Sequence, residues 1–68
     1  MYPLIITVSN HQRPVRVFVN QIVSIEPIMQ DGYKSRISTT SGDNILANEP
    51  PAELVKMIDD EWQRIIQL

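Results

Sequence analysis

The residues best suited to chemistry in this chain are basic and aromatic side chains in its first half. Arg16, Lys34 and Arg36 fall at outward-facing positions of segments with β character, and Arg13 lies in a preceding turn. Arginine forks and aromatic rings together suit a phosphate-bearing base or nucleotide. If the segments align, the cations form one patch. The candidate ligand-binding residues are then Arg13, Arg16, Lys34, Arg36 and Tyr33.

The charge distribution limits what such a patch can bind. The formal net charge is −2 at pH 7, but residues 1–42 carry four basic and two acidic side chains, whereas residues 43–68 carry two basic and six acidic ones. A mildly basic front and an acidic back of the chain are compatible with front-to-back assembly or with a small anionic partner at the front. The same charge distribution is also compatible with two ordinary solvent-exposed faces. Because nucleic-acid-binding domains show a far stronger basic excess, we expect no nucleic-acid partner.

No catalytic constellation can be assembled from the sequence. The adjacent carboxylates of Asp59, Asp60 and Glu61 fan out by about 100° per helical residue and do not converge. No serine lies in a nucleophile elbow, and the two glycines, Gly32 and Gly42, are too few for a phosphate-binding loop. With no cysteine and a single histidine, no metal site is expected. The chain is therefore predicted to be non-enzymatic, without a metal or a cofactor.

Strands over about residues 3–48 must position these groups. The expected strands are rich in β-branched residues or alternate between apolar and polar positions, and they cover residues 4–9, 15–19, 22–26, 33–40 and 44–47. Residues 10–14 read as a turn, and Asp31-Gly32 is the clearest hairpin signal. Asn20-Gln21 reads as a bulge or a bend. Short connections between consecutive strands predict an antiparallel meander of four or five strands.

The end of the chain, residues 51–67, has a helical period instead. Its apolar stripe spans an arc of about 120° and is predicted to face the sheet. The stripe consists of Leu54, Val55, Ile58, Trp62, Ile65 and Ile66, so Trp62 is assigned to the core. The predicted fold class is α+β: an antiparallel four- to five-stranded β-meander followed by one C-terminal α-helix packed on the sheet. Residues 1–68 are expected to form a single small domain.

Self-association is expected because the sheet is apolar on both faces. Alternation within residues 22–26 places Val23 and Ile25 on one face and Ile22 on the other, and one helix is too narrow to cover both faces. Exposed contiguous apolar patches usually mark an interface, and a chain of 68 residues without disulfides has little other support. The candidate interface residues are Phe18 and Ile22 on the strands, with Met57, Glu61 and Leu68 beside the helical stripe.

The compartment is expected to be the cytoplasm, and no membrane is expected as a partner. The chain lacks cysteine, which fits a reducing compartment. Its first residues have no basic segment before a short apolar run, so they make a poor signal peptide. No apolar run approaches the roughly 18 residues that a membrane-spanning helix needs.

The stretch VFVNQIVSIEP and the later stretch SGDNILANEPPAELVKMI are similar to segments of the small flagellar proteins of the FlbD/SwrD type. The resemblance covers roughly residues 15–59. The matching positions are Phe18, Asn20, Ile22, Ile25 and Glu26 in the first segment, and Gly42, Glu49, Glu53, Val55 and Ile58 in the second. Pro50 departs from the family's cap serine, and the middle hairpin is longer. The resemblance implies a small meander-plus-helix fold with no enzymatic role.

Two functions are compatible with these features. The first is a non-enzymatic regulatory or inhibitory protein that acts as a homo-oligomer on a protein partner, in motility as the resemblance implies or as a product of a phage or prophage. The alternative is a sponge-type protein that sequesters a nucleotide-like anion between its subunits. In the second case, the four cations of the first half of the chain would grip the ligand in a groove between copies.

Overall fold

The computed structural model describes residues 4–66, and in this range the chain forms five strands and one long helix. The strands are β1 (Ile5–Asn10), β2 (Arg13–Phe18), β3 (Ile22–Gln30), β4 (Tyr33–Thr39) and β5 (Asn44–Ala47). A 3₁₀ turn, η1 (Val19–Gln21), joins β2 to β3, and the helix α1 (Pro51–Ile66) follows β5. The predicted α+β fold, a β-meander followed by a C-terminal helix on the sheet, is confirmed.

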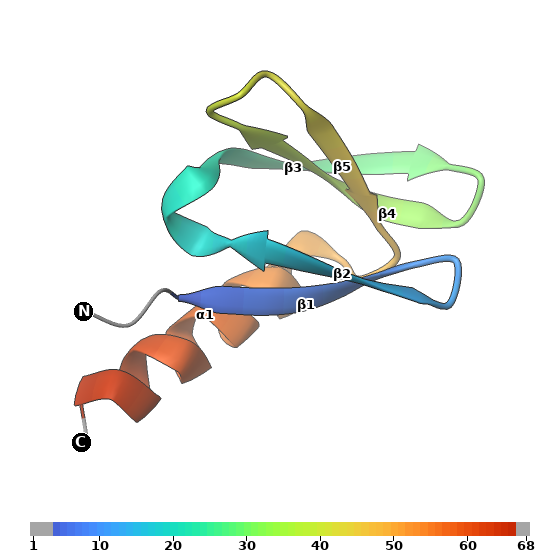
Figure 1. Ribbon diagram of the computed structural model, residues 1–68. Coiled ribbons are helices and arrows are strands. Elements are labelled where there is room, and N and C mark those ends of the chain that lie inside the picture. The colour runs from blue at the N-terminus through green and yellow to red at the C-terminus, as the bar shows by residue number, and fades with distance from the viewer. Residues whose placement is uncertain (1–3, 67–68) are drawn as a thin grey trace.

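The strands form two antiparallel sheets, in which each strand pairs with its neighbour in the sequence. One sheet is the β1–β2 hairpin, and the other has the order β3–β4–β5. The backbone N–H of Asn48, just after β5, donates to the carbonyl of Ser9 on β1 at 2.8 Å and joins the two sheets. Figure 1 shows α1 running beneath β1, with its C-terminal end projecting beyond the strands.

Two-residue turns close both long hairpins. His11 and Gln12 have φ values of 47° and 71°, and Asp31 and Gly32 have φ values of 52° and 84°. Two consecutive residues with positive φ are typical of type I′ turns, whose twist matches that of the flanking strands. The Asp31-Gly32 turn is as predicted, but the first turn is tighter than the predicted residues 10–14. The bend predicted at residues 20–21 is the 3₁₀ turn η1.

The core lies between the two sheets and the helix. Its buried apolar side chains alternate along the strands, as predicted for β2 and β4, and the helix contributes one of them. They are Ile6, Val8, Val17, Ile37, Ala47 and Leu54. Half-buried apolar side chains, among them Ile22, Ile25 and Met57, pack around this centre. The core is small, so each of its members matters to the stability of the domain.

The alternation predicted at the start of β3 is wrong. Ile22 and Ile25 both pack against the core, and Val23 is 66% exposed. The register explains the difference, because it shifts between Ile22, which pairs with Thr39, and Ser24, which pairs with Ser38. A β-bulge of this kind inserts one unpaired residue and changes the face on which the following side chains lie.

The prediction that Trp62 belongs to the core is also wrong. Leu54 is buried and Met57 and Ile58 are packed around the core, whereas Val55 is 51%, Trp62 48% and Ile66 70% exposed. The helix packs on β1 and β3, and this contact is narrower than the apolar arc. One edge of the stripe therefore extends past the strands. Within residues 4–66, the helix is too short and too polar to span a bilayer.

Candidate functional site

The main candidate site is the exposed apolar edge of α1, which we call the helix flank: Val55, Asp59, Trp62 and Ile66. These positions are spaced by four, three and four residues, so they are neighbours along one side of the helix. Three of the four side chains are large and apolar, and each of those three is about half exposed or more. In Figure 1 the C-terminal end of α1 projects beyond the strands. Such a projecting apolar surface can bind another chain without any change in the fold.

The opposite side of α1 meets the start of β1 and holds two of the predicted interface residues. Met57 packs against the core, and Glu61 is half-buried and accepts a hydrogen bond from Nη2 of Arg64 at 2.5 Å. A shallow cavity of about 340 Å³ lies here, lined partly by Ile5, Met57 and Glu61. Met57 and Glu61 are therefore engaged within the chain, and the predicted Leu68 lies outside the described residues.

The remaining predicted interface residues lie near η1. Phe18, at the end of β2, is 49% exposed, whereas Ile22 packs against the core. Phe18 and Arg16 line a cleft of about 220 Å³ between β2 and the loop from β4 to β5. Asp43 and Ser41 also line this cleft. Because an acidic residue shares the cleft with Arg16, the cleft is less favourable to an anion than a purely basic one.

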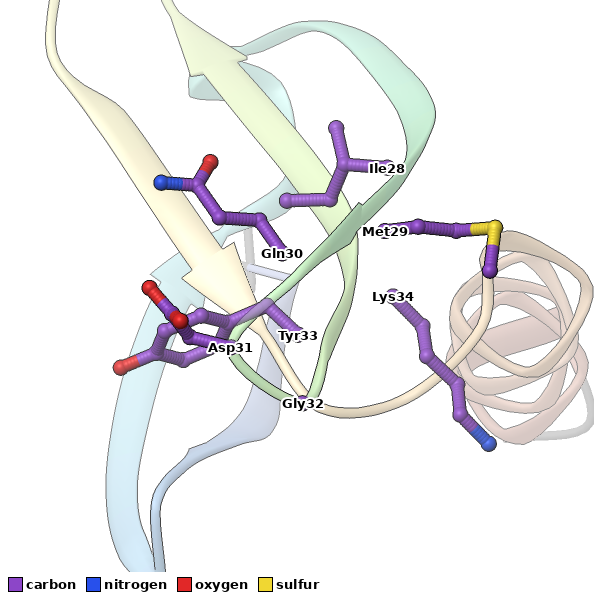
Figure 2. A pocket seen from close by; sticks show the side chains of 7 residues that line it. All are labelled: Ile28, Met29, Gln30, Asp31, Gly32, Tyr33 and Lys34. Atoms are coloured by element: carbon purple, nitrogen blue, oxygen red, sulfur yellow. The ribbon is translucent and has the colours of Figure 1, made fainter.

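A second exposed surface is the concave side of the β3–β4 hairpin, which we call the hairpin pocket. It has a volume of about 500 Å³ and is lined by the continuous run Ile28–Lys34. The register shifts between the pairs Pro27–Ser35 and Gln30–Tyr33, so Ile28 and Met29 together lie opposite Lys34. This second bulge displaces Met29, whose side chain is 100% exposed. Figure 2 shows Met29 and Lys34 pointing to the same side of the hairpin.

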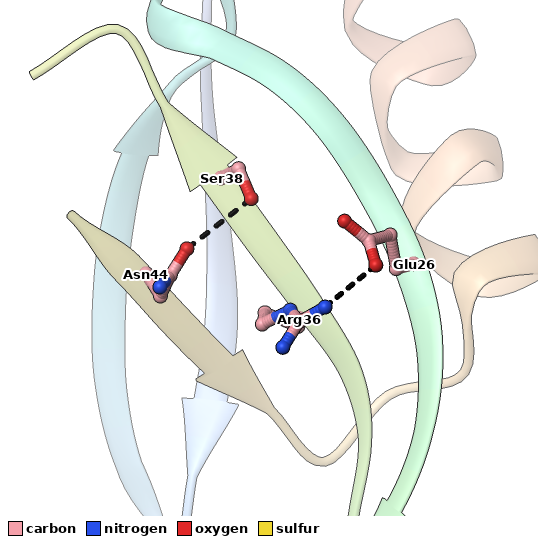
Figure 3. Close-up of polar contacts among 4 residues, drawn as sticks. All are labelled: Glu26, Arg36, Ser38 and Asn44. Carbon is pink, nitrogen blue, oxygen red and sulfur yellow. Dashed lines mark hydrogen bonds and ion pairs between the residues drawn. The ribbon is translucent and has the colours of Figure 1, made fainter. Parts of the chain in front are cut away.

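The four cations predicted to bind an anion do not line a common cavity. Arg16 lines the cleft beside Phe18, and Lys34 lines the hairpin pocket with Tyr33. Arg36 lies on the outer face of the three-stranded sheet, where its Nη2 is 2.6 Å from a carboxylate oxygen of Glu26 (Figure 3). Arg13 follows the first turn and is exposed. None of the three cavities described above is lined by more than one of these cations.

The ring of Tyr33, a predicted ligand-binding residue, is held in place by contacts with other residues of the same chain. Its centroid lies 4.2 Å from that of His11, and its hydroxyl donates to Oδ1 of Asn10 at 3.1 Å. Tyr33 also lines the hairpin pocket, but Figure 2 shows its ring on the side of the hairpin away from Met29 and Lys34. Its stacking face is already shared with an imidazole, which reduces what it can offer a bound base.

Sequence reasoning missed the polar residues that hold the two hairpin turns together. The side chain of Asn48 accepts from the backbone N–H of His11 at 2.6 Å and donates to the carbonyl of Gly32 at 3.1 Å. The carboxylate of Glu49 accepts from the backbone N–H of Ser9 at 2.9 and 3.0 Å. No short-range signal could have identified these bonds, because they join residues 16 to 40 positions apart. They fix the hairpin pocket relative to the rest of the molecule.

Polar chemistry is sparse within the described part of the chain. Among residues 4–66, no cluster of three histidine, aspartate or glutamate side chains is suited to a metal ion. Ser35 is the buried polar side chain of this range, and its hydroxyl donates to the carbonyl of Glu49 at 2.7 Å. The exposed face of the three-stranded sheet carries the pairs Glu26–Arg36 and Ser38–Asn44, shown in Figure 3. These contacts are satisfied within the sheet.

Comparison with models of protein families, with curated proteins and with solved structures gives no match. The resemblance to the FlbD/SwrD type stays a prediction. The function proposed below is therefore inferred from the surfaces described above.

Proposed function

We propose that the protein is a non-enzymatic binding module that acts as a homo-oligomer and that engages protein surfaces through its helix flank. A regulatory or inhibitory effect follows from such binding, since the module occupies a surface of its partner without converting it. The observation that carries this proposal is the exposure of Val55, Trp62 and Ile66 on one side of a projecting helix.

The energetics favour burial of this surface by another chain. Full burial of a fully exposed large apolar side chain is worth about 1.5–3 kcal/mol, and the apolar side chains of the flank, which are 48–70% exposed, can gain roughly half of that each. Tryptophan is also among the residues that most often dominate binding energy. A chain of 68 residues has few other means of adding stability. Association through the helix flank would supply additional stability without enlarging the core.

The alternative, sequestration of a nucleotide-like anion between subunits, has less support. It needs several cations to converge on one ligand, and no cavity described above is lined by more than one of Arg16, Lys34 and Arg36. Arg36 is moreover paired with Glu26. We therefore favour the protein-binding function.

Sedimentation velocity over a range of micromolar concentrations tests the proposal. We expect the wild-type chain to sediment faster as its concentration rises, because association follows mass action. A variant with Trp62→Gln and Ile66→Gln, called the helix variant below, should stay a monomer with unchanged circular dichroism. Both substituted side chains are exposed, so the fold should be retained.

A control variant changes two exposed residues on the polar side of the same helix, Lys56→Gln and Gln63→Ala. It should associate as the wild type does. A single folded species of 7.8 kDa at every concentration of the wild-type chain would refute homo-oligomerisation. Equal loss of association in the control would show that the helix flank is not the binding surface.

A further inference from the structure

We infer that copies of this chain bind head to tail, with the helix flank of one copy seated in the hairpin pocket of the next. This inference rests on the proposed function, since it names the surface that the helix flank binds. The partner it commits to is a second copy of the same chain.

The C-terminal part of the helix flank and the hairpin pocket lie toward opposite ends of the molecule. In Figure 1 the C-terminal half of α1 and the β3–β4 turn point in opposite directions, and the longest dimension of the described chain is 39 Å. Two such surfaces cannot meet within one copy. They can meet between copies without rearrangement of either hairpin or helix, which is the common behaviour of preorganised interfaces.

Their shapes and polarities match. The helix flank is convex and carries a large indole in its second half, whereas the hairpin pocket is an open hollow of about 500 Å³. The pocket offers the fully exposed thioether of Met29. Methionine adapts its shape and makes favourable contacts with aromatic rings. Trp62 against Met29 is therefore the expected central contact.

Charge decides between head-to-tail and symmetric pairing. In a parallel twofold pair of helix flanks, Asp59 would lie against its own copy, which is repulsive. In an antiparallel twofold pair, the axis passes between Asp59 and Trp62, so the carboxylate would be covered by an indole with no cation of the flank beside it. The hairpin pocket instead presents Lys34 on the same side as Met29 (Figure 2). Neither Asp59 nor Lys34 has an ion-pair partner within residues 4–66. Asp31 also lines the pocket, but its carboxylate points to the other side of the hairpin.

A mixing experiment tests the pairing. The hairpin variant carries Met29→Gln, and the helix variant carries Trp62→Gln with Ile66→Gln. Each variant alone lacks one of the two surfaces, so neither should self-associate at concentrations where the wild type does. Mixed in equal amounts, they should form a heterodimer with one copy of each, because the intact flank of one fits the intact pocket of the other. Native mass spectrometry distinguishes this heterodimer by its mass.

A matched control is Val23→Gln, which changes an apolar side chain of β3 that is 66% exposed and lies outside both surfaces. It should associate as the wild type does. If the hairpin variant alone associates like the wild type, or if the mixture stays monomeric, head-to-tail pairing is overturned while the helix flank remains a binding surface. If the wild type never associates, the proposal of homo-oligomerisation itself is wrong. The experiment therefore distinguishes an error in the head-to-tail pairing from an error in the proposed function.

Discussion

Asn48 uses both ends of its side chain to connect two turns that are far apart in the sequence. Its carbonyl oxygen accepts from His11, and its amide donates to the carbonyl of Gly32. Gly32 has a φ of 84°, and a Cβ placed there would lie 3.7 Å from Cε1 of His11. The positive φ of the turn, rather than lack of space, therefore accounts for glycine at this position. The two turns pack closely because Asn48 closes the gap between their backbones.

We expect Asn48→Ala to lower the free energy of unfolding by about 1 kcal/mol, because two hydrogen bonds to backbone groups are lost at once, both at exposed sites. Urea denaturation followed by circular dichroism measures the change. The matched control is Asn44→Ala, whose side chain accepts a hydrogen bond only from Ser38 at an exposed site; its effect should stay within about 0.5 kcal/mol. Equal losses in the two variants would contradict a special role for Asn48.

At the scale of the element, α1 is amphipathic, but only part of its apolar arc is used by the fold. Leu54 is fully buried, and the adjacent Val55 is half exposed. Leu54 and Val55 both belong to the predicted apolar stripe, but they differ in their structural role. One contributes to the core, and the other contributes to the surface proposed for binding.

Alanine substitutions should separate these tasks. Leu54→Ala should destabilise the domain by about 3 kcal/mol, because it leaves a cavity in the core. Val55→Ala should change stability by less than about 0.5 kcal/mol, since an exposed valine is lost and alanine has the higher helix propensity. Thermal and urea unfolding of dilute protein measure both. A loss at Val55 as large as that at Leu54 would mean that α1 is rotated from its described position.

Local patterns predicted the elements well. The strand at residues 44–47 has the predicted bounds, the helix begins at the predicted residue 51, and the Asp31-Gly32 turn lies where its glycine indicates. The predicted helix end at residue 67 lies outside the described residues. These features depend on neighbours in the sequence, which explains why they can be read from it. By contrast, the burial of the apolar side chains of α1 depends on how many strands lie beneath the helix. A helical period gives the direction of an apolar stripe but not the width of the surface that covers it.

The candidate site was harder to predict than the elements. Phe18 was correctly expected to point outward, but the exposed side chains of the helix were assigned to the core. The bulge that displaces Met29 leaves no mark in the pattern of apolar residues, because it is defined by the pairing of β3 with β4. The cations were expected to form one patch, yet Arg16 lies on β2 of one sheet, and Lys34 and Arg36 lie on β4 of the other. The relative position of two sheets is a property of tertiary packing.

At the scale of the whole molecule, the basic residues are spread over a small and elongated body. The described chain measures 39 × 22 × 19 Å, and the cations lie in the cleft, in the hairpin pocket, on the outer sheet face and after the first turn. A phosphate group gains most from several donors held at once. No such arrangement exists within a single copy over residues 4–66, so strong binding of a nucleotide is not expected.

Thermal unfolding with mono-, di- and cyclic nucleotides should therefore give the same Tm as without them. A ligand that binds only the folded state raises stability by RT ln(1 + [L]/Kd), so a shift that grows with concentration would reveal binding. Such a shift would support the sponge function instead. Its loss on substituting Arg16 and Arg36 by alanine would then identify the residues that bind the nucleotide.

The chain contains one tryptophan, and Trp62 lies on the helix flank rather than in the core. Indole emission moves to shorter wavelength when water is removed from around the ring. The intrinsic fluorescence of this protein is consequently a poor indicator of whether a single copy is folded. It is a direct optical signal of whether another molecule covers the end of the helix, and no dye or label has to be attached to obtain it.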